Sequence, residues 1–433
     1  MDETYGTKKT VGDKVALLGL FVAALLIARL FVALKSVIVL SQPIILTRTG
    51  LSVSMPTGKG WRNEKQWKYQ ENGFALSSDF TLDFSKPTAW AYCQYLFAAQ
   101  KAPPQKWFDQ KASEVGGAII NMGQTRKDTF TIDWAHIINP EMLLNTFFGT
   151  ANLPDNRRLN VEVHQILGDG ELAKRVFEGI IKSLKFNDNQ LLKAGAEIIA
   201  AIKSKGLGSF VNDKNQQDLF LIKDSGSRTI GFTMDTLSDS GSDVKLNVQV
   251  ASLFYVRSLY TFEQETSFQS TNNLDEFAYS SQTDSRTDRD STEIILDKAG
   301  LMTVRKFGEE ANYHLSPTAI PDVFLEQLLG QMLQGNKKEI IVDIIDSNGK
   351  IIPVFVSGVE DQEDIVADGK AAYILKMELL DGRGFSGQLY LNEQKKIYKR
   401  LVKQQDTYTF ERAGIEDLVR EFPEQAEKIL RKI

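Results

Sequence analysis

The most constraining feature of this sequence is the apolar run at residues 15–40, VALLGLFVAALLIARLFVALKSVIVL. Residues 15–34 have the length that a helix needs to cross a hydrocarbon core of about 30 Å. Thirteen Leu, Ile, Phe or Val side chains in those residues favour insertion by roughly 4 to 8 kcal/mol, which exceeds the roughly 3 kcal/mol cost of Arg29. We therefore predict a transmembrane helix within residues 15–40, so that the lipid bilayer is a partner of this segment.

A cleaved signal peptide is the competing interpretation, because residues 15–28 would suit its apolar core. The tolerable cleavage site, Val39-Leu40-Ser41, lies beyond the charged Arg29 and Lys35, and no cysteine follows it for lipid attachment. We favour an uncleaved anchor.

The orientation of the helix is weakly determined by its flanking charges. Three lysines precede it and three basic residues lie in or after it, which is nearly a tie under the positive-inside rule. The head is short and polar, so we predict a cytoplasmic head at residues 1–14 and a periplasmic body from residue 41. The basic residues are Lys8, Lys9 and Lys14, then Arg29, Lys35 and Arg48. The expected location is the inner membrane of a bacterium, as a single-pass signal-anchor protein.

Composition limits the remaining choices. A chain of 433 residues suggests two or three domains, and 42% hydrophobic residues suffice for packed cores. The net charge of −5 argues against a nucleic-acid partner. Cys93 is the only cysteine, which excludes an intrachain disulfide or a multi-cysteine metal site.

The first soluble domain, which we place at residues 41–187, ends in a strand and a helix. Residues 158–166 read RLNVEVHQI, with Leu159, Val161 and Val163 on one face of a strand. After a break at residues 168–170, apolar residues recur at helical spacing. They are Leu172, Val176, Phe177, Ile180, Ile181 and Leu184. The pattern indicates an α+β domain with a C-terminal amphipathic helix.

Residues 50–187 resemble PsbP-type domains. The resemblance rests on the early segment MPTGKGW at residues 55–61 and on the late strand, glycine break and helix ending in IIKSLKF at residues 180–186. It implies an antiparallel sheet sandwiched by helices and an accessory role without enzymatic activity, and no functional motif of that family transfers to this chain.

A helical linker is predicted at residues 188–209, because apolar residues recur on one side before Gly206 and Gly208. Strand patterns dominate the second soluble domain, residues 210–433. Asn348-Gly349 between two apolar runs indicates a hairpin. Helices are expected near residues 321–333 and at residues 415–433.

Residues 210–413 resemble the LolA-like half-barrel family. The matching features are LDKAGLMTV at residues 296–304, the helix IPDVFLEQLLGQML at 320–333, and QLYLNEQKKIYKRLV at 388–402. The resemblance implies a curved, mostly antiparallel sheet around a helix, with an apolar concave side that holds acyl chains in some members. Members of that family that act as carriers are soluble, so a tethered chain departs from a shuttling role.

Two motifs resemble catalytic signatures but lie in the wrong context. Gly382, Gly384 and Gly387 match G-x-G-x-x-G, yet strands are expected on both sides, whereas a dinucleotide site needs a following helix. A kinase loop would also need an H-R-D motif, which the chain lacks. Ser347 and Lys350 match S-x-x-K but lie at the expected hairpin tip instead of a helix start. We interpret both as turns.

The other candidate chemistry is also discounted. His136, His164 and His314 are scattered, and Cys93 lies in an apolar strand pattern that suggests an inert thiol. The acid-rich residues 238–243 and 283–293 lack the EF-hand order and read as solvated loops, with a weak calcium site as the alternative. The tryptophans read as core or half-buried residues, with an aromatic binding face as the alternative. They are Trp61, Trp67, Trp90, Trp107 and Trp134.

The sequence thus assigns no catalytic, cofactor-binding or metal-binding residue, and no cofactor. We expect a non-enzymatic, membrane-anchored periplasmic protein that binds a protein partner or an envelope component. The alternative is a tethered module that binds a lipid or lipoprotein in the curved C-terminal sheet. An enzyme of unrecognised type is the third hypothesis.

Overall fold

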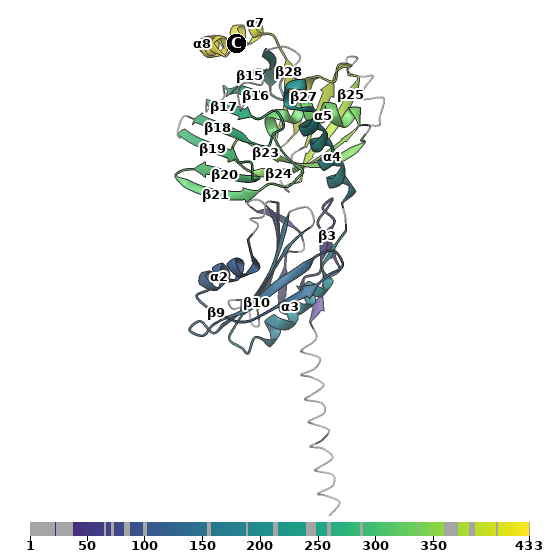
Figure 1. The fold of residues 1–433 in the computed structure, drawn as a ribbon, viewed down its shortest axis with the longest axis vertical. Helices are drawn as coiled ribbons and strands as arrows, with labels where there is room; N and C mark the ends of the chain where they lie inside the picture. Colours follow the sequence, from purple (N-terminus) through teal and green to yellow (C-terminus); the bar gives the residue numbers. More distant parts are fainter. Residues whose placement is uncertain are drawn as a thin grey trace, which may run out of the picture.

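The computed structural model of the chain describes residues 22, 38–64, 66–70, 73–81, 87–97, 102–153, 157–187, 189–210, 215–239, 248–257, 261–285, 289–335, 337–358, 371–380, 386–403 and 406–432. The fold is mostly β-sheet with curved sheets and several helices. Figure 1 shows two β-rich domains stacked along the long axis of the molecule.

The predicted transmembrane helix lies almost wholly outside the described residues. In the described part of the chain, no helix combines the length and the apolar character that crossing a membrane requires. The prediction of a helix through residue 40 was wrong at its end, where Val39–Leu40 forms strand β1. The reason is its antiparallel pairing with strand β4, Pro56–Thr57.

Short strands at the start of the first domain pack beside its last helix. Strand β3, Leu51–Val53, pairs with β2, Ile44–Ile45, on one side and with β13, Lys185–Phe186, on the other. A Cβ atom on Gly50 would lie 2.1 Å from the carbonyl oxygen of Asn187, and the φ angle of Gly50 is +77°. A glycine is therefore required where these two chain segments meet.

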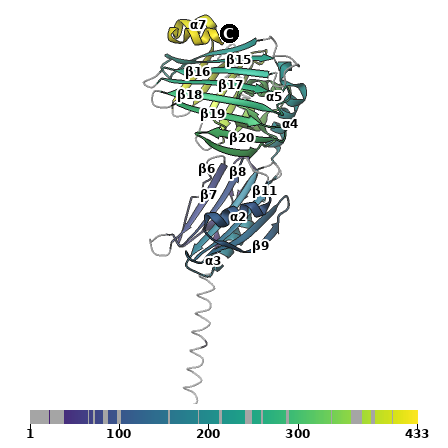
Figure 2. The same cartoon turned by 60° about the vertical axis from the view of Figure 1, so that its left-hand side comes forward.

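The main sheet of the first domain contains eight described strands, in the order β5-β7-β8-β12-β11-β10-β9 with β6 pairing on β7. Helix α2 packs on one face and helix α3 on the other (Figure 2). The predicted strand and helix at the end of the domain are confirmed, and Leu159, Val161 and Val163 are buried under α3. The elements are β5 (Trp61–Asn63), β6 (Lys68–Gln70), β7 (Gly73–Phe80), β8 (Ala89–Leu96), α2 (Pro104–Glu114), β9 (Ala118–Arg126), β10 (Thr131–Asn139), β11 (Leu144–Asn152), β12 (Arg158–Ile166) and α3 (Glu171–Ser183).

The second domain is built on one sheet of fifteen described strands, in the order β21-β20-β19-β18-β17-β16-β15-β14-β28-β27-β26-β25-β24-β23-β22. All neighbours are antiparallel except β22 and β23. The strands are β14 (Asn215–Lys223), β15 (Thr229–Asp239), β16 (Val248–Val256), β17 (Phe262–Ser270), β18 (Phe277–Ser285), β19 (Arg289–Leu296), β20 (Leu301–Lys306), β21 (Glu309–His314), β22 (Ala319–Pro321), β23 (Glu339–Ile345), β24 (Ile351–Gly358), β25 (Tyr373–Leu379), β26 (Ser386–Leu391), β27 (Ile397–Lys403) and β28 (Thr407–Arg412).

Two helices follow the sequence prediction in position. The helix expected near residues 321–333 is a 3₁₀ turn, η2 (Asp322–Phe324), continuing into α5 (Leu325–Gln334). The helix expected at residues 188–209 is α4 (Gln190–Lys205), followed by the 3₁₀ turn η1 (Leu207–Phe210). Helix α4 packs against β23 and α5, so it belongs to the core of the second domain and is more than a linker.

The prediction of a single helix at residues 415–433 was wrong. The described chain forms α7 (Ile415–Glu421), the 3₁₀ turn η3 (Pro423–Gln425) and α8 (Ala426–Arg431). Pro423 explains the break, because it lacks the N–H that would continue the helix and disfavours helical geometry at the residue before it. The helices pack on the outer face of β14, β15 and β16 through Leu418, Phe422 and Ile429.

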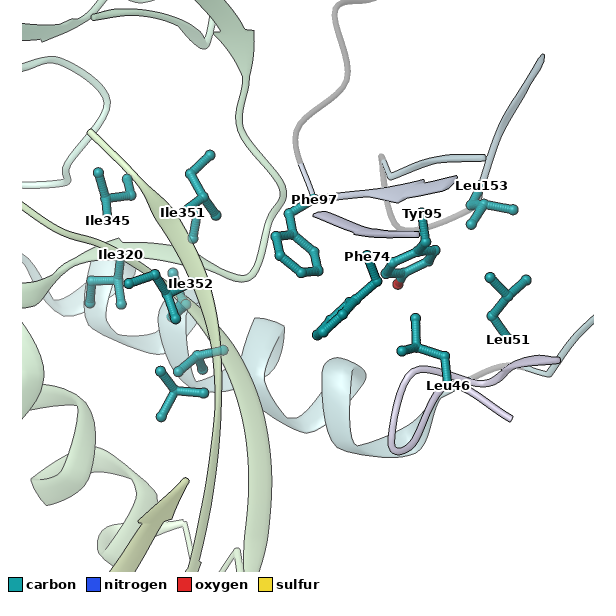
Figure 3. Packing of buried hydrophobic residues seen from close by; sticks show 14 of the residues in the cluster. Leu46, Leu51, Phe74, Tyr95, Phe97, Leu153, Ile320, Ile345, Ile351 and Ile352 are labelled. Atoms are coloured by element: carbon teal, nitrogen blue, oxygen red, sulfur yellow. The ribbon is translucent and has the colours of Figure 1, made fainter. Parts of the chain in front are cut away.

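The two domains share one hydrophobic core. Phe74, Tyr95 and Phe97 of the first domain and Ile345 and Ile351 of the second belong to the same buried cluster (Figure 3). A continuous apolar interface of this kind holds domains in a fixed arrangement, whereas a solvated linker would permit independent motion.

An ion pair lies inside the same interface. Arg157 Nη2 donates to both carboxylate oxygens of Asp343, at 2.7 and 2.9 Å, and neither side chain is exposed. Tyr95 accepts a hydrogen bond from Arg157 Nη1 at 2.9 Å, and the Thr318 hydroxyl donates to Asp343 at 2.6 Å.

Candidate ligand-binding site

The concave side of the second sheet is occupied by the chain itself. Phe324, Leu328, Leu329 and Met332 of η2 and α5 are buried against it, with at most 1% of each exposed. The Phe324 ring packs edge-on to Phe268 of β17, with ring centroids 5.1 Å apart. The apolar part of the concavity is therefore filled, as a packed core is.

A cavity of about 310 Å³ with both polar and apolar side chains in its wall remains beside α5. Its wall contains side chains from β15, β16, β17, β18 and β27 and from η2. Those that bear on its chemistry are Asp235, Gln264, Tyr279, Asp322, Arg400 and Phe410.

The strand register aligns Asp235, Ser252 and Thr266, which line this cavity, with two further polar side chains. Asp235 pairs with Ser252, Ser252 with Thr266, and Thr266 with Ser281, across four adjacent strands. Ser281 in turn pairs with Thr292 on β19. Because directly paired residues project from the same face of a sheet, these five side chains form a polar row on the concave side.

Hydrogen bonds fix the polar groups at one end of the row. Gln264 donates through Nε2 to the hydroxyl oxygens of Ser281 and Ser347, each at 2.9 Å. The Tyr279 hydroxyl donates to Asp322 Oδ1 at 3.0 Å. These contacts preorganise donors and acceptors around the cavity.

Burial raises the pKa of both acids of the cavity. Burial raises the pKa of Asp322 to about 7, in spite of its bond from Tyr279. Burial also raises the pKa of Asp235, although the neighbouring Arg400 works against that shift. A protonated carboxyl group can both donate and accept a hydrogen bond.

Arg400 supplies the permanent charge. Its guanidinium lies over the Phe220 ring, 4.5 Å from the centroid, in a cation–π arrangement. Its Nε is buried and has no hydrogen-bond partner among the described residues. Arg400 therefore lines the cavity together with two carboxyl groups, and its buried Nε is unpaired in the described part of the chain.

The arrangement is suited to binding. In the described parts of the chain, no cluster of three or more His, Cys, Asp or Glu is placed to hold a metal ion. A wall that contains hydroxyl, amide and carboxyl groups matches a ligand rich in hydrogen-bonding groups.

Of the two discounted motifs, only the second lies in a described turn. Gly387 lies in β26 beside β25, and Gly382 and Gly384 lie outside the described residues. Ser347 and Lys350 lie in the turn between β23 and β24, where Gly349 has a φ angle of +75°. The hairpin prediction at Asn348-Gly349 is confirmed.

The structure does not bring the three histidines together. His136 stacks on Phe147 with ring centroids 4.0 Å apart, and burial lowers its pKa. His164 lies on β12 beside Glu162, and His314 ends β21. Cys93 is fully buried in β8, and burial raises the pKa of its thiol, which agrees with an inert cysteine.

The acid-rich stretches are only partly described. Residues 240–247 and 286–288 lie outside the described part of the chain, and the rest belong to strands β15, β18 and β19. The five tryptophans are half-buried. Trp61, Trp67 and Trp134 pack against the main core, and Trp107 of α2 packs against a smaller cluster that includes Phe148.

The polar row was missed by sequence reasoning. Its members come from five strands, and hydroxyl residues alternating in strands such as β17 and β18 gave the only signal. Which strand neighbours which, and in which register, is needed before such residues can be seen as one surface.

Comparisons with known proteins give weak likenesses. No family model and no curated protein sequence matches this chain. One similar solved structure is a β-barrel-like protein of the DUF1849 domain of unknown function from Brucella abortus, with 10% identity, a TM-score of 0.34, and coverage of 46% of this chain and 95% of that chain. Another is a DUF1089 family protein from Pseudomonas aeruginosa, with 16% identity, a TM-score of 0.23, and coverage of 38% and 87%.

Proposed function

We propose that this chain is a non-enzymatic binding protein of the bacterial envelope that holds a small neutral polyhydroxylated ligand, such as a sugar, within its second domain. The observation that carries the proposal is the cavity lined by Asp235, Ser252 and Thr266 of the polar row together with Arg400. Hydroxyl, amide and carboxyl groups around an aromatic ring can pair with several ligand hydroxyls at once.

A polar ligand is favoured over an acyl chain because of where α5 lies. Leu328, Leu329 and Met332 occupy the apolar concavity, and the remaining space has both polar and apolar side chains in its wall. The alternative is a tethered module that binds a lipid or lipoprotein, and co-purified acyl chains in the test below would indicate it.

The proposal also includes the membrane anchor and the resemblances of the two domains to PsbP-type and LolA-like proteins. The apolar residues 15–40 would tether the body to the inner membrane with the two domains in the periplasm. Helices α2 and α3 on opposite faces of the first sheet support a PsbP-like domain, and the curved sheet around α5 supports a LolA-like half-barrel.

The test uses the full-length chain in detergent. Native mass spectrometry should detect a co-purified polar ligand, and calorimetric titration with a panel of hexoses and N-acetylhexosamines should find a saturable binder. The Arg400→Gln variant should bind at least tenfold more weakly, since Arg400 offers its guanidinium to the cavity.

Arg305→Gln is the matched control, because Arg305 on the outer face is 52% exposed and pairs with Glu293 and Glu310. It should bind as the unmodified chain does. Co-purified acyl chains, the absence of saturable binding across the panel, or equal binding by Arg400→Gln would reject the proposal.

A further inference from the structure

A second cavity lies in the first domain, between α2 and the faces of β8 and β12. Its volume is about 330 Å³, at the lower end for a small-molecule site. Figure 2 shows α2 lying across this face of the sheet. We name it the α2 cleft, defined by Trp107, Lys111, Gln94, Arg158, Asn160 and Glu162.

One strand contributes an unusual row of polar residues to this face. Arg158, Asn160, Glu162 and His164 alternate along β12, and each has at most 9% of its surface exposed. Buried polar groups normally have hydrogen-bond partners. Three of the four do: Thr150 donates to Asn160, Lys111 and His164 bond Glu162, and Thr146 bonds His164.

Arg158 is the exception. Its Nε and Nη1 are buried and have no hydrogen-bond partner among the described residues. The guanidinium lies over the Trp107 ring, 3.5 Å from its centroid, which fixes its plane. Burial lowers the pKa of Arg158 to about 10, and no carboxylate offsets that shift.

The other charged groups of the cleft bond one another. Lys111 contacts Glu114 at 2.5 Å and Glu162 at 3.1 Å. Arg158 has no carboxylate that offsets its burial, and it lies in a buried and oriented position. A planar guanidinium is the group that best matches a carboxylate.

We propose that the α2 cleft binds the carboxylate group of a small acid or of a peptide C-terminus, with Arg158 stacked on Trp107 as its recognition group. Gln94 and Asn160 lie across from each other on β8 and β12 and offer amide groups to the rest of the ligand. This site is separate from the cavity beside α5 in the second domain and does not depend on the function proposed for that cavity.

The test follows tryptophan emission of the full-length chain, because all five tryptophans lie in the first domain and Trp107 contacts Arg158. The probes are N-acetyl-trialanine, its C-terminal amide, succinate and inorganic phosphate. At least one carboxylate probe should give a saturable change, and the amide should give none. A stronger response to N-acetyl-trialanine than to succinate identifies a peptide C-terminus, and the reverse identifies a free acid.

Variants separate binding from folding. Arg158→Gln should weaken carboxylate binding at least tenfold, and Arg158→Lys should weaken it less, because it keeps the charge and loses the planar stack. Lys174→Gln removes an equal charge from the exposed side of α3 and should bind normally. The melting temperature of Arg158→Gln should equal or exceed that of the unmodified chain, since an uncompensated buried charge is removed.

Three results would overturn the inference. One is an equal response to N-acetyl-trialanine and its amide. Another is a phosphate response at least as strong as that of every carboxylate. The third is an Arg158→Gln variant that melts several degrees lower, or an Arg158→Lys variant that does so if the first does not fold, because Arg158 would then be a structural residue.

Discussion

The ion pair between Arg157 and Asp343 gives the sharpest test of the interface between the two domains. Replacing Arg157 by Met keeps an apolar stem of similar length and removes the guanidinium. Asp343, which is fully buried, then keeps only the 2.6 Å bond from Thr318 among the contacts described above. Its carboxylate loses the 2.7 and 2.9 Å bonds from Arg157.

The expected cost follows from burial. Removing one partner of a fully buried pair costs about 3–5 kcal/mol, because the other charge stays uncompensated in a medium of low dielectric. Replacing both partners by apolar residues avoids that charge, so Arg157→Met with Asp343→Leu should recover most of the loss. The contact between Arg48 and Glu378 also joins the two domains, but its side chains are 31% and 50% exposed. Glu378→Gln should therefore cost under about 1 kcal/mol.

Urea denaturation with two probes provides the assay. Tryptophan emission follows only the first domain, whereas far-ultraviolet circular dichroism follows both. In the unmodified chain the two transitions should coincide because the core is shared. Arg157→Met should lower the free energy of unfolding by several times the effect of Glu378→Gln. Equal effects of these two variants, or a double variant as unstable as the single one, would refute the reasoning.

Three further outcomes can be checked by thermal and chemical denaturation. Burial raises the pKa of Asp322 from 3.8 to about 7. At a pH between these two values, Asp322 is protonated in the folded state and ionised in the unfolded state. The free energy of unfolding should therefore fall as pH rises from about 4 to about 7. Asp322→Asn removes this dependence and should raise stability at pH 8 by at most about 4 kcal/mol, with little change at pH 4; an unchanged pH profile would contradict the burial argument. Gly195→Ala places a Cβ 2.0 Å from the carbonyl oxygen of Ile341 and should lower the free energy of unfolding by about 1–3 kcal/mol. Gly179→Ala, whose Cβ would lie 3.4 Å from Leu40, should raise it by up to about 1 kcal/mol. The same sign for both variants would count against the close approach of α4 to β23. Leu329→Ala should cost about 2–5 kcal/mol, because Leu329 is fully buried and α5 fills the concave sheet; a cost below about 1 kcal/mol would mean that this space is loosely packed.

Local patterns predicted the elements that depend on neighbouring residues. The periodicity of residues 171–184 predicted α3, and Val176, Ile180 and Leu184 are fully buried. Asn348-Gly349 predicted a hairpin, which β23 and β24 form. The exception is the C-terminal helix, where the apolar periodicity outweighed the evident signal of Pro423.

Features that depend on distant residues could not be predicted in the same way. Arg157 and Asp343 are 186 positions apart, and nothing local to either residue indicates the other. The sequence predicted α4 as a helical linker between the domains, but Gly195 allows the helix to approach β23 closely. The polar row of the second domain requires the register of five strands. Each feature is set by tertiary packing, which a single sequence does not contain.

The adjacent residues Arg157 and Arg158 show why the two arginines need different explanations. Arg157 turns into the interface, where Asp343 neutralises it, so a structural role accounts for its burial. Arg158 turns to the opposite side, over Trp107, where no carboxylate offsets its buried charge. Such a charge costs stability unless something pairs with it, and strongly perturbed groups in clefts often mark functional sites. A carboxylate from outside the chain supplies the missing partner, which is why the α2 cleft, and not the interface, is where we look for a ligand in the first domain.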